Sequence, residues 1–211
     1  MKQKAIIFDL DGVICFTDKY HYLAWKALAD ELGIYFDETI NNRLRGVSRM
    51  ASFEIILERY EGEPLSDEEK VACTEKKNTL YREMLKNMSP ADLSDEVKNT
   101  LDELRARGLK LAIGSSSKNT PFILERIGLA DYFDAVSDGN NIQNSKPDPE
   151  VFLKAAEFLG IAPEDCLVVE DAEAGVQGAF AGGMEAAALG DAASLKCGTY
   201  NMDTFADLLK I

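Results

Sequence analysis

The chain has 211 residues, of which 46% are hydrophobic and 28% charged, a composition that fits one folded domain, or one domain with a smaller insert, and excludes a disordered chain. Its 37 acidic residues outnumber 23 basic ones and give a net charge of −14, so no general field favours nucleic acid or an anionic membrane as a partner. Such a chain attracts cations such as Mg²⁺, and an anionic substrate would need a few local lysines and arginines.

Cysteine and histidine chemistry is scarce. The only histidine, His21, and the absence of a C-x-x-C pair argue against a zinc site and against a Ser/His/Asp triad with any other base. The apolar run over residues 5–8 is too short for a signal peptide, and no stretch approaches the roughly 20 apolar residues of a membrane span. Scattered thiols then favour a reducing, cytoplasmic location. They are Cys15, Cys73, Cys166 and Cys197.

The first predicted element is a strand over residues 4–8, an apolar run that stops at Asp9. An unbroken apolar run is typical of a strand buried on both faces of a parallel sheet. Residues 109–114 and 166–169 form two similar runs, and each is followed by polar residues and a helical pattern. The repeated order of strand, loop and helix predicts an α/β fold with a doubly wound, Rossmann-like parallel sheet.

A stretch without strand character separates the first strand from the second. It is too long for a simple connection, and its helical spacing predicts a helical cap domain over residues 17–86, inserted into a core formed by 1–16 and 87–211. Ser66 and Glu69 form a capping box before the third helix of this insert. The predicted cap helices cover residues 20–32, 49–60 and 66–86.

The remaining elements follow the core pattern. Their starts and ends are indicated by proline near the first turn and glycine after the last turn of several helices. Helices are predicted over residues 95–107, 120–127, 149–159, 172–181 and 204–210, and shorter strands over 133–136 and 185–189.

Polar side chains follow the three long strands. In open α/β sheets the site lies beyond the carboxyl ends of the strands, so these residues converge if their strands are neighbours. Several carboxylates at one point are costly unless a cation lies among them, and oxygen ligands without His or Cys favour Mg²⁺. With a hydroxyl and a lysine added, the set suits a phosphoryl group. The residues are Asp9, Asp11, Ser115, Lys146, Glu170 and Asp171.

The sequence D-L-D-G-V at residues 9–13, followed in order by Ser115, Lys146 and the pair Glu170–Asp171, resembles the four motifs of the haloacid dehalogenase superfamily. The resemblance implies that Asp9 is the nucleophile that forms an aspartyl-phosphate and that Asp11 is the general acid/base. It also implies that Ser115 and Lys146 hold and neutralise the phosphate. Glu170 and Asp171 would bind Mg²⁺ with Asp9 and the backbone carbonyl of Asp11.

Elementary chemistry agrees with these roles. A carboxylate nucleophile is already ionised at neutral pH and needs no activating base. A second carboxyl must carry a proton to or from the substrate oxygen, and crowding with other anions would raise the pKa of Asp11 for that purpose.

The predicted cap carries H-Y-L-A-W-K-A-L-A at residues 21–29 and L-R-G-V-S-R at residues 44–49, and within the superfamily these segments are similar to those of the phosphohexomutases. A mutase must hold one phosphate while the other reacts, and the fork of Arg49 suits that second phosphate. The resemblance implies further roles in substrate binding for residues of the cap and of the loop after the second long strand. They are Thr17, His21, Trp25, Gly46, Val47, Arg49, Ser52, Lys77, Ser117, Lys118 and Asn119.

The expected function is therefore a Mg²⁺-dependent phosphohexomutase that interconverts β-D-glucose 1-phosphate and glucose 6-phosphate as a cytoplasmic monomer. Its partner would be a small sugar phosphate, with no nucleic acid and no membrane. The alternatives are a sugar-phosphate phosphatase on the same scaffold, a phosphorylated receiver module, or a catalytically silent binding protein. Single residues have plainer alternatives too, because His21 would also suit a structural role and Trp25 would also suit core packing.

Overall fold

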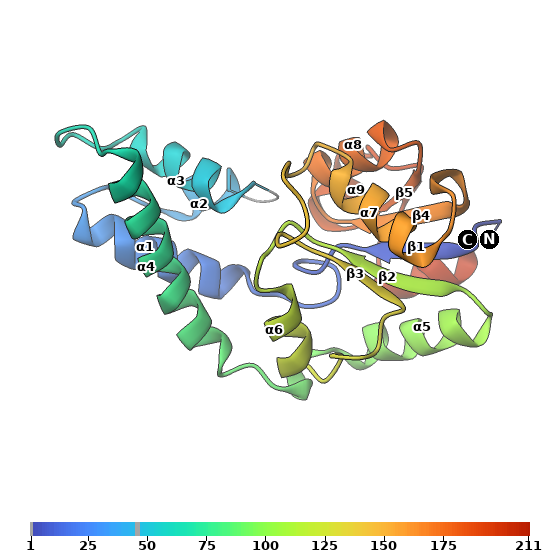
Figure 1. The fold of residues 1–211 in the computed structure, drawn as a ribbon. Coiled ribbons are helices and arrows are strands. Elements are labelled where there is room, and N and C mark those ends of the chain that lie inside the picture. Colours follow the sequence, from blue (N-terminus) through green and yellow to red (C-terminus); the bar gives the residue numbers. More distant parts are fainter. Residues whose placement is uncertain (1, 45–46) are drawn as a thin grey trace. The chain divides into compact units, whose positions relative to one another are not determined.

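The computed structural model describes residues 2–44 and 47–211, which divide into two compact units (Figure 1). Unit 1 consists of Met1–Phe16 and Ser89–Ile211, and unit 2 of Thr17–Met88. The second boundary falls two residues after the expected one. The reason is local, because the amides of Lys86 and Met88 still bond to the carbonyls of Glu83 and Leu85 in the helix before them.

Unit 1 is built on a parallel sheet, as predicted. In the described residues the sheet has six strands in the order β3-β2-β1-β4-β5-β6. β1 is central, and its Ile7 is paired with Ala112 of β2 on one side and with Val168 of β4 on the other. The strands are β1 (Ala5–Phe8), β2 (Lys110–Gly114), β3 (Ala135–Ser137), β4 (Cys166–Glu170), β5 (Glu185–Ala188) and β6 (Tyr200–Asn201).

The longer helices of unit 1 follow the sequence pattern, whereas the short η1, η2 and α9 were not predicted and the closing helix differs in type. The closing segment, predicted as a helix over residues 204–210, is a 3₁₀ helix whose start has a capping box between Thr204 and Asp207. The helical elements are η1 (Pro90–Asp92), α5 (Asp95–Ala106), α6 (Thr120–Arg126), α7 (Glu150–Leu159), η2 (Pro163–Asp165), α8 (Glu173–Ala181), α9 (Gly190–Ser194) and η3 (Phe205–Lys210).

Both faces of the sheet are covered, which explains the unbroken apolar runs. Ile7 packs on one face in a cluster with Phe152 of α7 and Val176 of α8. Phe8 packs on the other face, where its ring centroid lies 5.7 Å from that of Phe205. Figure 1 shows α7 and α8 on one side of the sheet and α5 on the other. Burying one side chain of this size contributes about 1.5–3 kcal/mol to the free energy of unfolding. A shift in strand pairing would expose these side chains, so the core fixes the register of the central strands.

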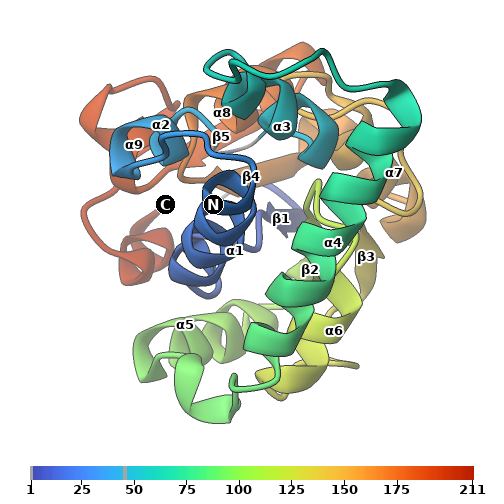
Figure 2. The ribbon, with the colours of Figure 1, turned by 90° about the vertical axis from the view of Figure 1, so that its left-hand side faces the viewer.

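Unit 2 is helical, and Figure 2 shows α4 along its length. α1 packs along α4, and α3 also packs against α4. The indole of Trp25 stacks on the ring of Phe53, with centroids 6.0 Å apart. The short α2 was not predicted, and it begins where the Asp37 carboxylate accepts a hydrogen bond from the Ile40 amide. The helices are α1 (Asp18–Glu31), α2 (Glu38–Asn42), α3 (Arg49–Leu57) and α4 (Asp67–Leu85).

In the part of the chain that the structure describes, no helix combines the length and the apolar character that crossing a bilayer requires.

Candidate active site

Three carboxylates meet at the carboxyl ends of two neighbouring strands. Asp9 follows β1, while Glu170 ends β4 and Asp171 comes next. The amide of Asp9 donates to the carbonyl of Val169 at 2.9 Å, which continues the pairing of β1 with β4. One carboxylate oxygen from each of Asp9, Glu170 and Asp171 lies within 4.8 Å of the others. Asp11 lies outside this group, and its role through the backbone carbonyl stays a prediction.

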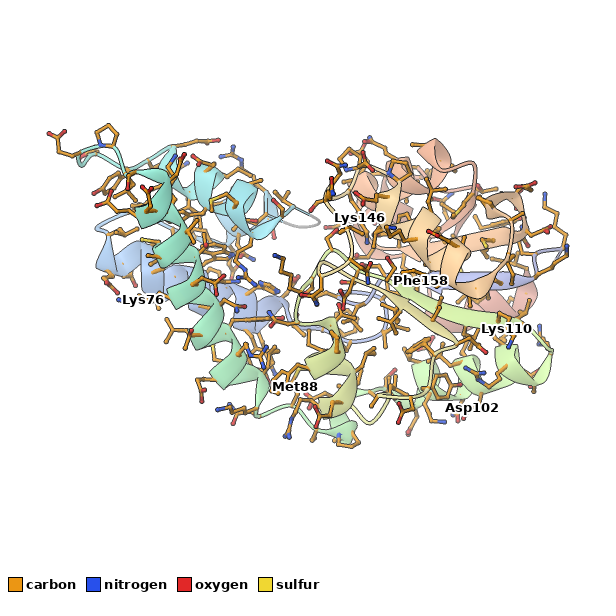
Figure 3. The ribbon with its side chains drawn as sticks, in the orientation of Figure 1. Lys76, Met88, Asp102, Lys110, Lys146 and Phe158 are labelled. Carbon is orange, nitrogen blue, oxygen red and sulfur yellow. The ribbon has the colours of Figure 1, made fainter. Side chains whose placement is uncertain are left out.

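A single lysine compensates two of these carboxylates. Lys146 lies on the loop before α7, as Figure 3 shows, and its side chain is only 2% exposed. Its Nζ lies 2.5 Å from Asp9 Oδ1 and also forms an ion pair with Glu170. Burial alone would lower the pKa of Lys146, but the charges of Asp9 and Glu170 outweigh it and hold that pKa above its usual range. Lys146 is therefore a fixed positive charge beside Asp9, the predicted nucleophile.

The carboxylates remain crowded despite this lysine. Burial, followed by the charges of Glu170, Asp9 and Asp11, raises the pKa of Asp171 to about 8. Burial and the nearby Asp9 also raise the pKa of Glu170, against the opposing effect of Lys146. Ionising all of these groups together requires another positive charge. Because every donor is a carboxylate oxygen, the set suits a hard divalent cation such as Mg²⁺.

The turn after β1 passes close to the third carboxylate. Gly12 has φ +89°, and a Cβ placed on it would lie 2.2 Å from Asp171 Oδ2. The turn is closed by hydrogen bonds from the amides of Ile14 and Cys15 to the carbonyl of Leu10. Glycine is required at position 12 for two reasons, because of its left-handed backbone and because of this close approach.

The loop after β2 carries the predicted hydroxyl. Ser115 is buried, and its Oγ accepts a hydrogen bond from the Ser117 amide at 3.2 Å. Ser117 Oγ accepts in turn from the Asn119 amide at 3.2 Å, so two serine side chains hold the turn that exposes Lys118. The sequence analysis did not single out Ser116, whose buried Oγ has no hydrogen-bond partner among the described residues. In a row of three serines no sequence signal separates this one from its neighbours.

Lys77 is a buried cation in unit 2, and the predicted cap residues His21 and Trp25 contact it, together with Tyr81, which the sequence did not indicate. Lys77 Nζ lies 2.9 Å from His21 Nδ1 and 4.5 Å from the centre of the Trp25 ring. The Tyr81 hydroxyl donates to Thr17 Oγ1 at 2.9 Å, and its ring centre lies 4.7 Å from the same Nζ. Burial, then the charges of Lys77 and Arg49, holds the pKa of His21 well below its usual range, so this ring is neutral. Trp25 is 2% exposed and packs in the core of unit 2.

Arg49 has a partner within the same unit. It is the first residue of α3, and its Nη1 lies 2.6 Å from Glu75 Oε1 on α4. Ser52 is buried on α3, and Val47 is half-buried before it. Gly46, another predicted substrate contact, lies outside the described residues. The predicted site residues thus form two groups, a phosphoryl-transfer set in unit 1 and a basic and aromatic set in unit 2.

Comparisons with known proteins agree with these motifs. Residues 3–183 match the family described as haloacid dehalogenase-like hydrolase. The chain is 41% identical over 188 residues to the β-phosphoglucomutase of Bacillus subtilis (strain 168), covering 89% of this chain and 83% of that protein. It is 30% identical over 184 residues to the phosphorylated carbohydrates phosphatase of Thermotoga maritima, covering 86% and 82%. The crystal structure of β-phosphoglucomutase from Clostridium difficile superposes with a TM-score of 0.91 at 35% identity, covering 98% of this chain and 93% of that one.

Proposed function

Because the chain belongs to the haloacid dehalogenase-like hydrolase family, we propose that this enzyme is a phosphohexomutase that interconverts β-D-glucose 1-phosphate and glucose 6-phosphate. The observation that carries the phosphoryl-transfer chemistry is the contact of Asp9 with Lys146 inside a cluster of carboxylates at the end of the central strand. The 41% identity to a β-phosphoglucomutase supports the choice of substrate.

Asp9 is the nucleophile in this proposal. Lys146 binds its Oδ1, which fixes the carboxylate and leaves the other oxygen for attack on the phosphorus. In the first half-reaction the phosphoryl group passes from Asp9 to a sugar hydroxyl, and the Asp9–phosphorus bond breaks as the new oxygen–phosphorus bond forms. The resulting bisphosphate reorients in the site. In the second half-reaction Asp9 attacks the other phosphoryl group, and the bond from that phosphorus to the sugar oxygen breaks. The enzyme returns to its phosphorylated form.

Asp11 moves the proton. It removes the hydrogen of the sugar hydroxyl in the first half-reaction and returns it to the leaving sugar oxygen in the second.

Asp9, Glu170, Asp171 and the Asp11 carbonyl would hold Mg²⁺. The fit rests on the all-oxygen donor set and on the raised pKa of Asp171, which burial and the charges of the neighbouring carboxylates produce. The cation would neutralise the charge that develops on the phosphoryl oxygens.

Two groups of residues would bind the two phosphates. The reacting phosphate would be bound by Ser115 and Lys146. The other phosphate would be bound by Arg49, Ser117, Lys118 and Asn119. Val47, Gly46 and Ser52 would contact the sugar, and His21, Lys77, Thr17 and Trp25 would support this binding surface. A clamp for a second phosphate separates a mutase from a hydrolase, because a hydrolase needs only one.

A second candidate is a sugar-phosphate phosphatase, which the similarity to the Thermotoga maritima phosphatase favours. In that reaction water, instead of a sugar hydroxyl, receives the phosphoryl group from Asp9. The same nucleophile and metal ligands would serve it.

Phosphorus NMR separates the two activities. The protein is mixed with Mg²⁺, β-glucose 1-phosphate and a trace of glucose 1,6-bisphosphate. We expect the glucose 6-phosphate signal to grow while inorganic phosphate stays minor. Release of inorganic phosphate as the main product, unaffected by added bisphosphate, would contradict the mutase and support the phosphatase.

We further propose a cytoplasmic monomer that acts on a small sugar phosphate, without nucleic-acid or membrane partners. The net charge of −14 and four free cysteines support these assignments.

A further inference from the structure

The chain after β3 runs along the loop that carries Ser115 and Lys118. Strand pairing of β2 with β3 ends at Gly114 and Ser137, but hydrogen bonds continue beyond it. The Ser115 amide donates to the Ser137 carbonyl at 3.0 Å, and the Gly139 amide donates to the Ser117 carbonyl at 3.2 Å. Residues 137–141 thus extend the sheet contact to the loop over residues 115–119.

Asn140 adds a side-chain contact to the same loop. Its Nδ2 donates to the carbonyl of Lys118 at 3.1 Å. With the bond from Gly139, the carbonyls of Ser117 and Lys118 are both held by the segment after β3. A peptide group is planar, so fixing its carbonyl also fixes the direction of the next amide. The two bonds therefore set the backbone on both sides of Lys118.

Gly139 lies too close to the loop for any side chain. A Cβ placed on it would lie 2.5 Å from the Ser116 carbonyl oxygen and 2.9 Å from the Lys118 nitrogen. Both neighbours are backbone atoms, so a larger residue could be accommodated only by moving the loop.

The segment itself is braced from within. Asp138 is buried, and its Oδ1 accepts from the Asn140 amide at 2.7 Å. Asn141 Oδ1 accepts from the Asp138 amide at 3.2 Å and from the Ser137 hydroxyl at 3.0 Å. A segment held by its own hydrogen bonds can impose its geometry on the loop beside it.

We propose that Gly139 and Asn140 are positioning residues that set the affinity of the enzyme for the non-reacting phosphate by fixing Lys118 and its neighbouring amides. The inference rests on the proposed function, in which Lys118 binds that phosphate. Neither residue needs to touch the substrate for this role. Their removal raises the KM for the sugar phosphate and leaves kcat nearly unchanged.

The first test compares two asparagines. Asn201 Nδ2 in β6 of the same unit donates to the Gly198 carbonyl at 3.1 Å, which is the same kind of bond between an asparagine side chain and a backbone carbonyl. Asn140→Ala is expected to raise the KM for β-glucose 1-phosphate, and the inhibition constant of inorganic phosphate, about three- to tenfold, the loss that one net hydrogen bond predicts. In Asn201→Ala the KM and the inhibition constant should both stay within twofold of those of the original protein. Equal KM values in the two variants would overturn the proposal.

The second test compares two glycines. Gly139→Ala should displace the loop and raise KM more than Asn140→Ala does. Gly183 has φ +75° and open space around its Cβ position, so Gly183→Ala strains the backbone without touching the loop. Thermal unfolding shows whether both variants fold. A KM rise in Gly183→Ala as large as in Gly139→Ala would assign the effect to stability and overturn the proposal.

A third variant separates this inference from the proposed function. Lys118→Ala should raise KM at least as much as Asn140→Ala. If it raises KM while the Asn140 and Gly139 variants do not, the positioning role is wrong and the phosphate role of Lys118 stands. If Lys118→Ala leaves KM unchanged, the assignment of the second phosphate fails, and the positioning role fails with it.

Discussion

Lys146 Nζ lies 2.5 Å from Asp9 Oδ1, and the same buried ammonium also pairs with Glu170. One cation thus serves the proposed nucleophile and a proposed metal ligand. An ion pair in a buried site is costly to form but even more costly to break, because the remaining partner keeps its charge without compensation. The pair therefore fixes the geometry of the site before a substrate arrives.

Replacing this lysine is expected to damage both stability and activity. Lys146→Met leaves Asp9 and Glu170 without their cation, which should lower the free energy of unfolding by about 3–5 kcal/mol. Urea denaturation measures the change. Lys210→Met is the matched control, because it removes an exposed pair with Asp207 and should change the free energy of unfolding far less. Similar losses in the two variants would show that the buried pair does not stabilise the fold.

The nucleophile can be tested by its covalent product. Asp9→Asn keeps the shape of the side chain but removes the attacking carboxylate. We expect turnover to fall by about four orders of magnitude or more, and the mass increase of a phosphorylated protein to vanish on incubation with bisphosphate. Asp165→Asn, which affects only a surface pair with Lys4, should keep both properties. A phosphorylated Asp9→Asn protein would assign the nucleophile elsewhere.

The stability of the metal-free protein should fall as the pH rises from about 4 to 8. The pKa of Asp171 is raised from an ordinary 3.8 to about 8. Between these values the folded state keeps a proton that the unfolded state has lost, so the free energy of unfolding decreases with pH, by at most about 1.4 kcal/mol per unit. Carboxyl groups with a lowered pKa, such as Asp207 at about 2, change the free energy of unfolding only below about pH 4.

Unfolding curves at several pH values, with and without Mg²⁺, check this pH dependence. Asp171→Asn should flatten the slope, because it removes one of two carboxyl groups with a raised pKa and leaves the other, Glu170. Mg²⁺ should restore stability at pH 8 in the original protein more than in the variant, since metal binding displaces the proton. A slope that persists unchanged in Asp171→Asn would assign the effect to another group.

The pair between Arg49 and Glu75 should compete with substrate. Their atoms Nη1 and Oε1 lie 2.6 Å apart, and a phosphate that uses the Arg49 fork must replace the carboxylate. Glu75→Gln should lower the KM for glucose 6-phosphate about two- to threefold, the range expected for an exposed pair.

Glu31→Gln is the control for this variant, because it breaks an exposed pair with Lys76 in the same unit. It should leave KM unchanged. A fall in KM in both variants would reflect the general gain of positive charge, and no fall in either would remove Arg49 from the list of phosphate ligands.

Much of the fold was predictable because it depends on local patterns. The apolar runs that became β1, β2 and β4 predicted a parallel sheet, and the sheet and the family are confirmed. Elements too short for a periodic signal were missed, among them α9 and the two-residue β6. β3 begins two residues later than predicted, since Phe133 packs its ring against Phe8 before the strand starts.

The site was predictable only as far as its residues belong to recognisable motifs. Asp9 and Lys146 are 137 residues apart, and their contact follows from motif order and sheet topology. The raised pKa of Asp171 depends on burial and on charges from other strands, so no local pattern encodes it. Gly139 and Asn140 were missed for the same reason, because Gly-Asn after a strand indicates only a turn.

The helical unit joins the α/β unit through two connections, at residues 16–17 and 88–89. Every strand of the sheet lies outside that interval, so insertions, deletions or whole replacement of the intervening helices would leave all strand pairings intact. Descendants of such a gene can therefore vary the whole helical unit while the carboxylate cluster at the strand ends is inherited unaltered.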